Sequence, residues 1–245
     1  MKNPTDVVIA SAARTPVGAF NGSLAALPAS ELGRTVISAA LDRANVAPEA
    51  VTEVIMGQIL TAGAGQNPAR QAAIGAGIPV ERTAMVINQL CGSGLRAVAL
   101  GFQSIRNGDA DVVIAGGQES MTQAPHCANL RNGQKLGSLE MIDSMLIDGL
   151  WDAFHGYHMG NTAENVAKQF NISREVQDAF AAASQQKAEA AQKAGRFEAE
   201  ITPVVVKGRK AEIRVDTDEH PPGSPLYALS PPPAITTSAS PLRMD

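Results

Sequence analysis

Short apolar runs alternate with helix-length amphipathic segments along the first 119 residues, and this alternation limits how the chain can fold. Because strands that alternate with helices usually pair in parallel, the fold class is predicted as α/β. A mostly parallel sheet should be covered by helices on both faces. A first helix is predicted after an N-cap at Ser30, with Leu32, Val36, Ala40 and Ala44 on one face. The predicted strands are residues 6–10, 53–57, 85–87 and 111–115. A second helix is predicted to start at Asn67 and Pro68 and to run through Arg70 and Ile74. A third, after Cys91, is predicted from an apolar face at helical spacing: Leu95, Val98, Ala99, Phe102 and Ile105.

The pattern changes after residue 119. Residues 121–160 are predicted as loop, followed by one helix from Asn161 to Phe170 and another from a Ser173 cap to Gly195. Two valine- and isoleucine-rich runs then flank 207–210 as a hairpin. Of the last 26 residues 7 are proline, which is typical of a disordered tail. The predicted divisions are an α/β domain at 1–119, an α+β domain at 120–219 and a tail at 220–245.

Composition excludes several classes of protein. The net charge is −4 with no block of like charge, so neither a nucleic-acid nor a membrane partner is expected. No apolar stretch approaches the roughly 18 residues of a membrane span, and no secretory signal is recognised. The two cysteines, Cys91 and Cys127, fit neither a disulfide framework nor a zinc spacing. We therefore expect a cytoplasmic protein with reduced thiols and no metal.

Cys91 lies between an apolar strand and an amphipathic helix, in a turn that contains Gly92 and Gly94. A sulfur near a helix N-terminus experiences a partial positive charge that favours the thiolate over the thiol. This context resembles a nucleophile elbow. The alternative is a small, buried and inert cysteine, and the residues alone leave both interpretations open.

Other candidate residues are less distinctive. His155 and His158 could act as a base or bind a metal, but without a third ligand nearby a surface or packing role is favoured. His126 is equally ambiguous, and Cys127 is expected to be an inert thiol. The basic cluster at 207–210 is expected to be a solvated turn, with phosphate contact as the alternative.

Five segments carry recognisable motifs, at 11–18, 65–72, 88–94, 116–121 and 156–160. They resemble motifs of the thiolase family, nearest to its biosynthetic acetyl-CoA acetyltransferase branch. The similarity runs from residue 5 to residue 219, and its last part follows the family's loop-domain ending at 204–219. The stretch Gly156–Gly160 points most specifically to the short-chain branch.

The resemblance implies a function. Cys91 would attack an acyl-CoA, hold the acyl group as a thioester and use its own N–H as one oxyanion donor. A second acetyl-CoA would then give acetoacetyl-CoA and CoA, reversibly. Leu150, His158 and Met159 would contact coenzyme A, which is a substrate and not a permanently bound cofactor. Residues 125–145 would tie dimers into a homotetramer.

The family's second half, with its activating histidine and its acid/base cysteine, has no counterpart in this sequence. Similarity is lost at His220, and Pro/Ser-rich sequence follows to Asp245. This pattern resembles a reading-frame shift or a truncated isoform. The alternative function is therefore a catalytically incomplete thiolase fragment with an exposed apolar face, whose assembly is doubtful.

Overall fold

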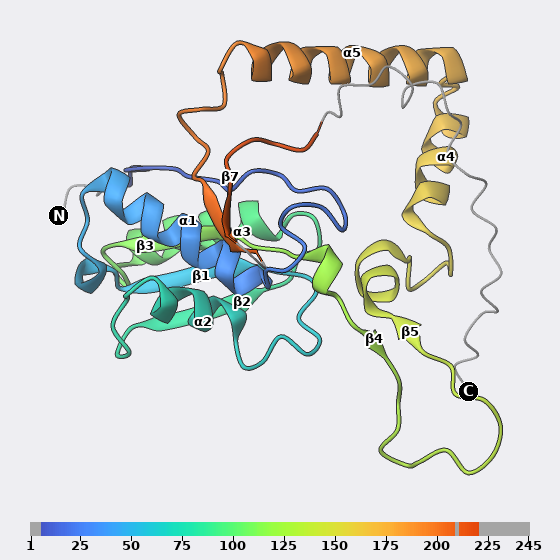
Figure 1. Cartoon of the computed structure of the whole chain (residues 1–245), viewed down its shortest axis with the longest axis horizontal. Coiled ribbons are helices and arrows are strands. Elements are labelled where there is room, and N and C mark those ends of the chain that lie inside the picture. Colours follow the sequence, from blue (N-terminus) through green and yellow to red (C-terminus); the bar gives the residue numbers. More distant parts are fainter. Residues whose placement is uncertain (1–5, 209–210, 221–245) are drawn as a thin grey trace. The chain divides into compact units, whose positions relative to one another are not determined.

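A computed structural model describes residues 6–208 and 211–220 (Figure 1). These residues form two compact units. Unit 1 runs to Gly149 and resumes from Ala199 to His220, and unit 2 is 150–198. The predicted tail lies outside the described residues except for His220. The predicted divisions at residues 119 and 219 stay predictions, because compact units of this kind do not test domain boundaries.

The centre of unit 1 is a three-stranded parallel sheet, as the alternating pattern predicted. Its strands are β1 (Glu53–Gly57), β2 (Thr83–Ile87) and β3 (Val113–Gly117), in the order β2-β1-β3. Gly57 is level with Ile87 on one side and with Gly117 on the other. The carboxyl ends of all three strands therefore meet at one edge of the sheet, where parallel α/β sheets usually bind ligands.

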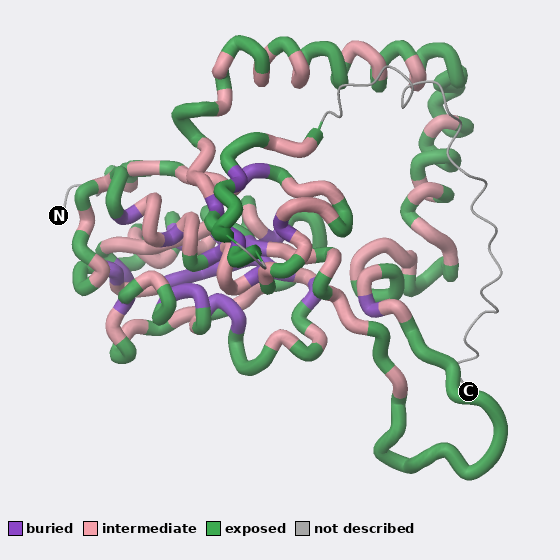
Figure 2. The backbone as a smooth tube through the Cα atoms, in the orientation of Figure 1, coloured by how far each residue is buried: buried purple, intermediate pink, exposed green. Residues whose placement is uncertain are grey.

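Helices cover both faces of this sheet (Figure 1). On one face, α1 (Ala29–Ala44) and α2 (Pro68–Gly75) bury the main apolar core with alternate residues of β1. On the other face lies α3 (Ser93–Asn107), which contacts β1 and β3. In Figure 2 the buried segments of unit 1 gather along the sheet. The largest fully buried side chains there are Ile37, Ile55, Met56, Val51, Val54 and Pro16.

The start of α2 explains why its prediction was correct. Asn67 has a left-handed backbone, with φ of 43°, and its Oδ1 accepts a hydrogen bond from the Arg70 N–H at 3.0 Å. Its Nδ2 donates to the Ala84 carbonyl at 2.9 Å, which ties the helix start to β2. Pro68 then occupies the first helical position, where no N–H is needed.

Three predicted strands need correction. The strand predicted at 85–87 begins earlier, because Thr83 already pairs with Glu53 of β1. Residues 6–10 form no strand, because no described segment supplies a hydrogen-bonded ladder for them, and Val8 and Ile9 are 75% and 81% exposed. The fourth strand begins at Val113 instead of Asp111. The cause is Thr52, whose Oγ1 accepts the N–H groups of Asp111 and Val112 before the ladder with β1 begins.

The predicted face of α1 is also wrong by one residue. Ser30 lies inside the helix and Pro28 is the N-cap, without a side-chain hydrogen bond. The buried stripe is the one that holds the two large residues Ile37 and Leu41 at i,i+4 spacing. It comprises Ala29, Gly33, Ile37 and Leu41.

Helix α3 buries its small residues and exposes its large ones. Ser93, Ala97 and Gly101 face the sheet, and a Cβ on Gly101 would lie 3.0 Å from a Val113 methyl carbon. Leu95 and Phe102, on the other side, are 79% and 51% exposed. The expected apolar face is therefore present, and no described segment of unit 1 covers it.

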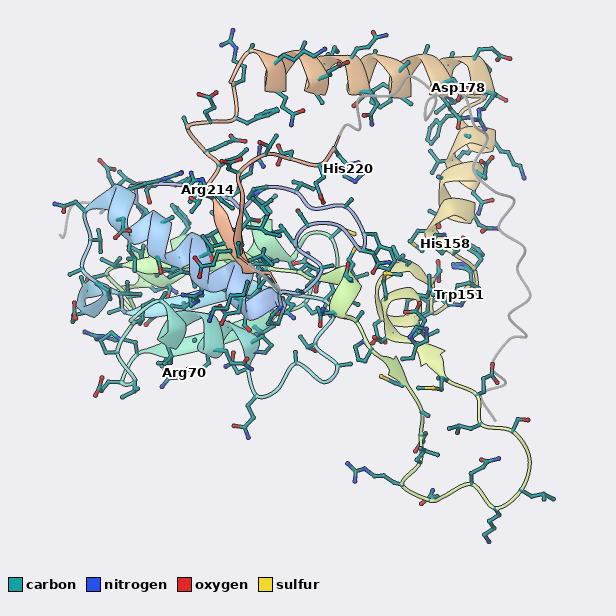
Figure 3. The ribbon with its side chains drawn as sticks, in the orientation of Figure 1. Arg70, Trp151, His158, Asp178, Arg214 and His220 are labelled. Atoms are coloured by element: carbon teal, nitrogen blue, oxygen red, sulfur yellow. The ribbon has the colours of Figure 1, made fainter. Side chains whose placement is uncertain are left out.

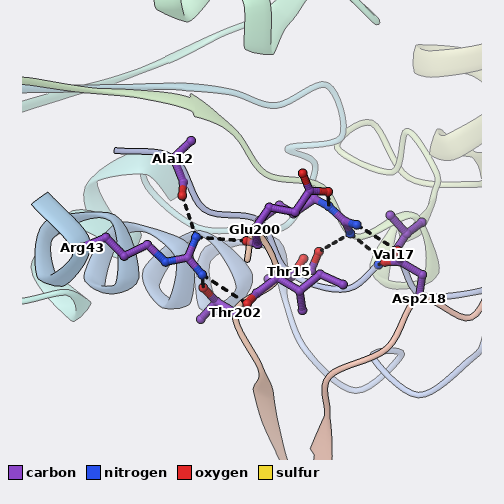
Figure 4. A network of polar contacts seen from close by, with 9 residues as sticks. Ala12, Thr15, Val17, Arg43, Glu200, Thr202 and Asp218 are labelled. Atoms are coloured by element: carbon purple, nitrogen blue, oxygen red, sulfur yellow. Dashed lines mark hydrogen bonds and ion pairs between the residues drawn. The ribbon is translucent and has the colours of Figure 1, made fainter. Parts of the chain in front are cut away.

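An arginine-centred network joins two distant segments of unit 1 (Figure 4). The Arg14 guanidinium donates two hydrogen bonds to Asp218, at 2.7 and 2.9 Å, and one to Glu200 at 2.6 Å. Asp218 also accepts the Val17 N–H at 2.8 Å. The Arg14 guanidinium lowers the pKa of Asp218 below its ordinary value, and Asp218 raises that of Arg14. Charge-assisted bonds therefore hold residues 14–17 against 200–218.

The predicted hairpin and the two predicted helices after residue 160 are present, whereas the segment 121–160, predicted as loop, contains short elements. The predicted hairpin is β6 (Val204–Lys207) with β7 (Glu212–Val215), antiparallel. Unit 2 contains α4 (Met159–Gln169) and α5 (Arg174–Lys193), and Ser173 caps α5 through the Val176 N–H. Among the described residues, none of the helices has the length and apolar character needed to cross a membrane. The short elements are η1 (Pro48–Ala50), η2 (Met121–Gln123), β4 (His126–Cys127), β5 (Ile142–Asp143) and a π-helical turn, η3 (Leu146–Leu150).

Candidate active site

Cys91 lies in a tight turn between the end of β2 at Ile87 and the start of α3 at Ser93. The turn is closed by hydrogen bonds from the Gly92 N–H to the Gln89 carbonyl at 3.1 Å and from the Ser93 N–H to the Leu90 carbonyl at 3.0 Å. Cys91 is exposed, which contradicts the alternative of a buried cysteine, and its role as a nucleophile stays a prediction. The turn places the residue at the N-terminal end of α3, as the sequence predicted.

Leu90 gives the turn its unusual shape. Its φ is 49°, a left-handed conformation that L-residues other than Gly, Asn and Asp rarely adopt. Strained backbone of this kind is concentrated at functional sites, where the surrounding structure must hold it in place. Here the Asn88 side chain accepts the Leu90 N–H at 2.9 Å. The strain therefore lies at the residue immediately before the candidate nucleophile.

Glycines allow α3 to begin directly against the sheet. A Cβ on Gly57, the last residue of β1, would lie 2.6 Å from both the carbonyl carbon and the Cβ of Ser93. Real Cβ atoms essentially never approach other heavy atoms so closely. On the facing strand, a Cβ on Gly117 would lie 3.3 Å from the Gly57 carbonyl oxygen. Because glycine has no side chain at these two positions, the turn of Cys91 can lie directly against the carboxyl edge of the sheet.

An open pocket lies beside Cys91 at this edge. Its polar side chains are fixed by hydrogen bonds, since Gln118 Nε2 donates to Gln58 Oε1 at 2.9 Å and Glu119 Oε2 accepts the Ile59 N–H at 2.8 Å. The sequence assigns no role to Gln58, Gln118 and Glu119, although the first two directly follow the glycines that end β1 and β3. The pocket is lined by Gly57, Gln58, Ile59, Leu90, Cys91, Ser93, Gly94, Gly117, Gln118 and Glu119.

The chemistry available at this pocket is that of a nucleophile. Cys91 presents a thiol beside the first turn of α3, where unsatisfied N–H groups and the helix dipole favour negative charge. Among the described residues that line the pocket, Glu119 is the other ionisable side chain. One of its oxygens is buried and the other is held by backbone N–H groups. The lining therefore supplies a nucleophile and contains no histidine.

The other predicted contact residues lie close together in sequence in unit 2. Leu150 ends η3, His158 caps α4 and Met159 begins it. The His158 Nδ1 accepts the Gly160 N–H at 3.0 Å, and His158 forms a backbone bridge with Trp151 (Figure 3 labels both). When neutral, His158 therefore carries its proton on Nε2, available to a ligand. The roles of these three residues stay predictions.

His155 has a partner within its own loop. Its Nδ1 lies 3.0 Å from Asp152 Oδ2, and its ring stacks on Tyr157 with centroids 5.6 Å apart. Asp152 also accepts the backbone N–H groups of His155 and Phe154, which lower the pKa of its carboxyl. These contacts favour a loop-ordering role for His155.

The remaining candidates gain no chemical role. Cys127 and His126 are exposed on β4, where His126 lies 3.8 Å from Asp143. Within the described ranges, no group of three or more metal-ligating side chains is arranged to hold an ion. The turn at 207–210 lies partly outside the described residues.

Comparison with known proteins places these features in context. Residues 7–229 match the family model of the thiolase N-terminal domain, ten residues beyond the similarity recognised in the sequence. Acetyl-CoA acetyltransferase of Shinella zoogloeoides is 66% identical over 220 residues, which are 90% of this chain and 56% of that protein. The cytosolic acetyl-CoA acetyltransferase of Rattus norvegicus is 57% identical over 225 residues, 91% of this chain and 57% of that one.

A solved structure shows the same fold. The crystal structure of Bacillus anthracis acetyl-CoA acetyltransferase superimposes with a TM-score of 0.85 at 37% identity, covering 88% of this chain and 55% of that one. The chain thus spans about half the length of the relatives it matches.

Proposed function

This chain belongs to the thiolase family, and we propose that it carries the nucleophile of an acetyl-CoA acetyltransferase. The reaction joins two acetyl-CoA molecules into acetoacetyl-CoA and CoA, reversibly, through an acetyl-Cys91 thioester. The observation that carries the proposal is the exposure of Cys91 on a strained turn at the N-terminus of α3. The whole activity is a proposal, since the chain spans 56% of its Shinella relative.

In the first step the Cys91 sulfur attacks the thioester carbonyl of acetyl-CoA. The C–S bond to coenzyme A breaks, CoA leaves as a thiolate, and the acetyl group remains on Cys91. The backbone N–H of Cys91 is proposed as one donor to the oxyanion of the tetrahedral intermediate, where preorganised donors lower the barrier. CoA is a substrate, and its proposed contacts are Leu150, His158 and Met159.

In the second step another acetyl-CoA loses an α-proton, and its carbanion forms the C–C bond to the acetyl carbon as the Cys91 thiolate leaves. No residue of this chain is assigned to remove that proton, because the described pocket lining contains no histidine. This observation favours the second candidate function, a chain that acylates Cys91 without completing turnover. General acid–base groups contribute about 10²–10⁴-fold each, so condensation by these residues alone should be negligible.

Three further proposals rest on the family relationship. The partner is an acyl-CoA, without nucleic acid or membrane. Residues 125–145 are proposed as the segment that joins copies into a homotetramer; β4 and β5 at its ends pair through two residues each. A cytoplasmic location is proposed because the Rattus relative is described as cytosolic.

Alkylation tests the nucleophile, and the chain supplies its own control. Cys91 and Cys127 are both exposed, so access alone should not distinguish them. Stabilisation of a thiolate by a helix end predicts that iodoacetamide labels Cys91 about two- to fivefold faster. Labelling of each thiol would be followed by peptide mass spectrometry, and Cys91→Ala should leave Cys127 unchanged. Equal rates in the folded chain would contradict the proposed nucleophile.

Acetyl transfer tests the chemistry. Incubation with acetyl-CoA should add one acetyl group to Cys91, detected on its peptide, and Cys91→Ala should abolish the adduct. The same sample should form no measurable acetoacetyl-CoA. Turnover by residues 1–245 that disappears in Cys91→Ala would contradict the second candidate function and would require a base from this chain.

A further inference from the structure

We infer that Ser93 is a positioning residue, which holds the strained turn that presents Cys91. The inference deepens the proposed function, because it rests on Cys91 being the nucleophile. Ser93 is 4% exposed, and its hydroxyl makes two hydrogen bonds. Its Oγ donates to the Leu90 carbonyl at 2.6 Å and accepts the Gln89 N–H at 2.8 Å. The hydroxyl is therefore hydrogen-bonded to the backbone of both residues that precede Cys91.

The direction of these bonds separates this role from ordinary helix capping. A capping hydroxyl precedes the helix and accepts an N–H from its first turn. Ser93 is instead the first residue of α3, and its hydroxyl bonds backward to the turn. The N-cap, Gly92, has no side chain and makes no side-chain bond. The hydroxyl thus contributes to the shape of the turn more than to the helix.

The turn needs such a restraint because the Asn88 side chain holds only the N–H of Leu90. Its left-handed φ of 49° is unfavourable for a residue with a Cβ, and its side chain is 53% exposed. Packing of the Leu90 side chain therefore offsets little of the strain. Without the Ser93 hydroxyl, the Gln89 N–H loses its partner and the Leu90 carbonyl keeps only the Ser93 N–H, so the backbone should relax toward an ordinary φ.

Relaxation at Leu90 would move the next residue. Cys91 is joined directly to Leu90, so a change in the Leu90 dihedrals rotates the Cys91 sulfur relative to the first turn of α3. The advantage that the helix end gives to the thiolate falls off within one turn. The expected effect is loss of the labelling advantage of Cys91 over Cys127, with the fold retained.

The test combines a deletion, a rescue and a matched control. Ser93→Ala removes the hydroxyl without adding bulk, and should bring the Cys91-to-Cys127 labelling ratio from about two- to fivefold down to about one. Leu90→Gly in the Ser93→Ala background should restore the ratio, because glycine adopts a positive φ without strain. Ser104→Ala makes the same chemical change in α3, where the hydroxyl bonds to Glu53, and should leave the ratio unchanged.

Each outcome decides the question. An unchanged ratio in Ser93→Ala, or a loss that Leu90→Gly does not restore, would overturn the inference. If circular dichroism shows that Ser93→Ala does not fold, the double variant with Leu90→Gly should still fold and show the wild-type labelling ratio. A double variant that also fails to fold would overturn the inference. A wild-type ratio of one would instead contradict the proposed nucleophile, which keeps the two failures distinct.

Discussion

Replacement of Gly57 by alanine should destabilise unit 1 by forcing α3 away from the sheet. The new methyl would lie 2.6 Å from the Ser93 carbonyl carbon and Cβ and 2.7 Å from the Gly94 nitrogen. Normal contact requires roughly 3.5 Å or more, so the start of the helix must move by nearly an ångström. Two of these three atoms are backbone, which cannot rotate out of the way. Overpacking of this kind typically costs about 1–3 kcal/mol.

Gly94→Ala provides the matched control. It adds the same methyl on the opposite side of the contact, but the nearest atom would lie 3.9 Å away. Alanine is favoured over glycine in a helix by about 1 kcal/mol, so this variant should be neutral or slightly more stable. The two variants thus differ in the sign of the effect although they add the same group.

Urea denaturation followed by far-UV circular dichroism measures both variants. Fluorescence of the single tryptophan is unsuitable, because Trp151 lies in unit 2 and would not report on the sheet. Gly57→Ala should lower the transition midpoint and also reduce Cys91 labelling, because the turn is displaced. A Gly57→Ala chain as stable as the wild type would refute the packing argument, and so would equal destabilisation by Gly94→Ala.

Two further predictions concern stability. Asp218→Asn should cost about 1–3 kcal/mol at neutral pH, because the partly buried charge-assisted bonds to Arg14 are weakened. Arg14 lowers the folded-state pKa of Asp218, so the stabilisation by this carboxylate is complete above the ordinary aspartate pKa and is lost as the pH falls through the lowered one. Urea melts of the wild type and of Asp218→Asn should therefore differ at neutral pH and converge at acid pH. Asn67→Ala should lower the free energy of unfolding by about 0.5–2 kcal/mol, because the side-chain cap on the Arg70 N–H and the bond to the Ala84 carbonyl are lost. Asn67→Asp should keep the cap on Arg70, and thermal melts of the two variants measure the difference.

Local signals in the sequence predicted most of the fold correctly. Asn67 followed by Pro68 marked the start of α2, and Ser173 marked the start of α5, because both caps act through their own side chains. The segment at 6–10 was predicted wrongly because strand formation depends on a partner, and the partner is not encoded in the run itself. Periodicity also misplaced the buried face of α3, since apolar spacing cannot reveal that small residues face the sheet.

The candidate site was only partly predictable. The position of Cys91 followed from the strand–turn–helix order and from adjacent glycines, which are local features. The left-handed Leu90 was not predictable, because leucine carries no signal for that conformation. Gln58, Gln118 and Glu119 meet Cys91 only through strand register, which places the ends of β1 and β3 side by side.

The close approach of Gly57 and Ser93 also limits how this protein can change in evolution. Because the Ser93 carbonyl carbon and the Gly94 nitrogen are backbone atoms, a smaller side chain at 93 would not make room for a larger residue at 57. Position 57 should therefore stay glycine whatever residue stands at 93. By contrast, Leu95 and Phe102 are exposed on the other side of α3, so substitutions there do not disturb the packing of the helix against the sheet. On a single helix, one face is therefore closed to substitution while the other remains open.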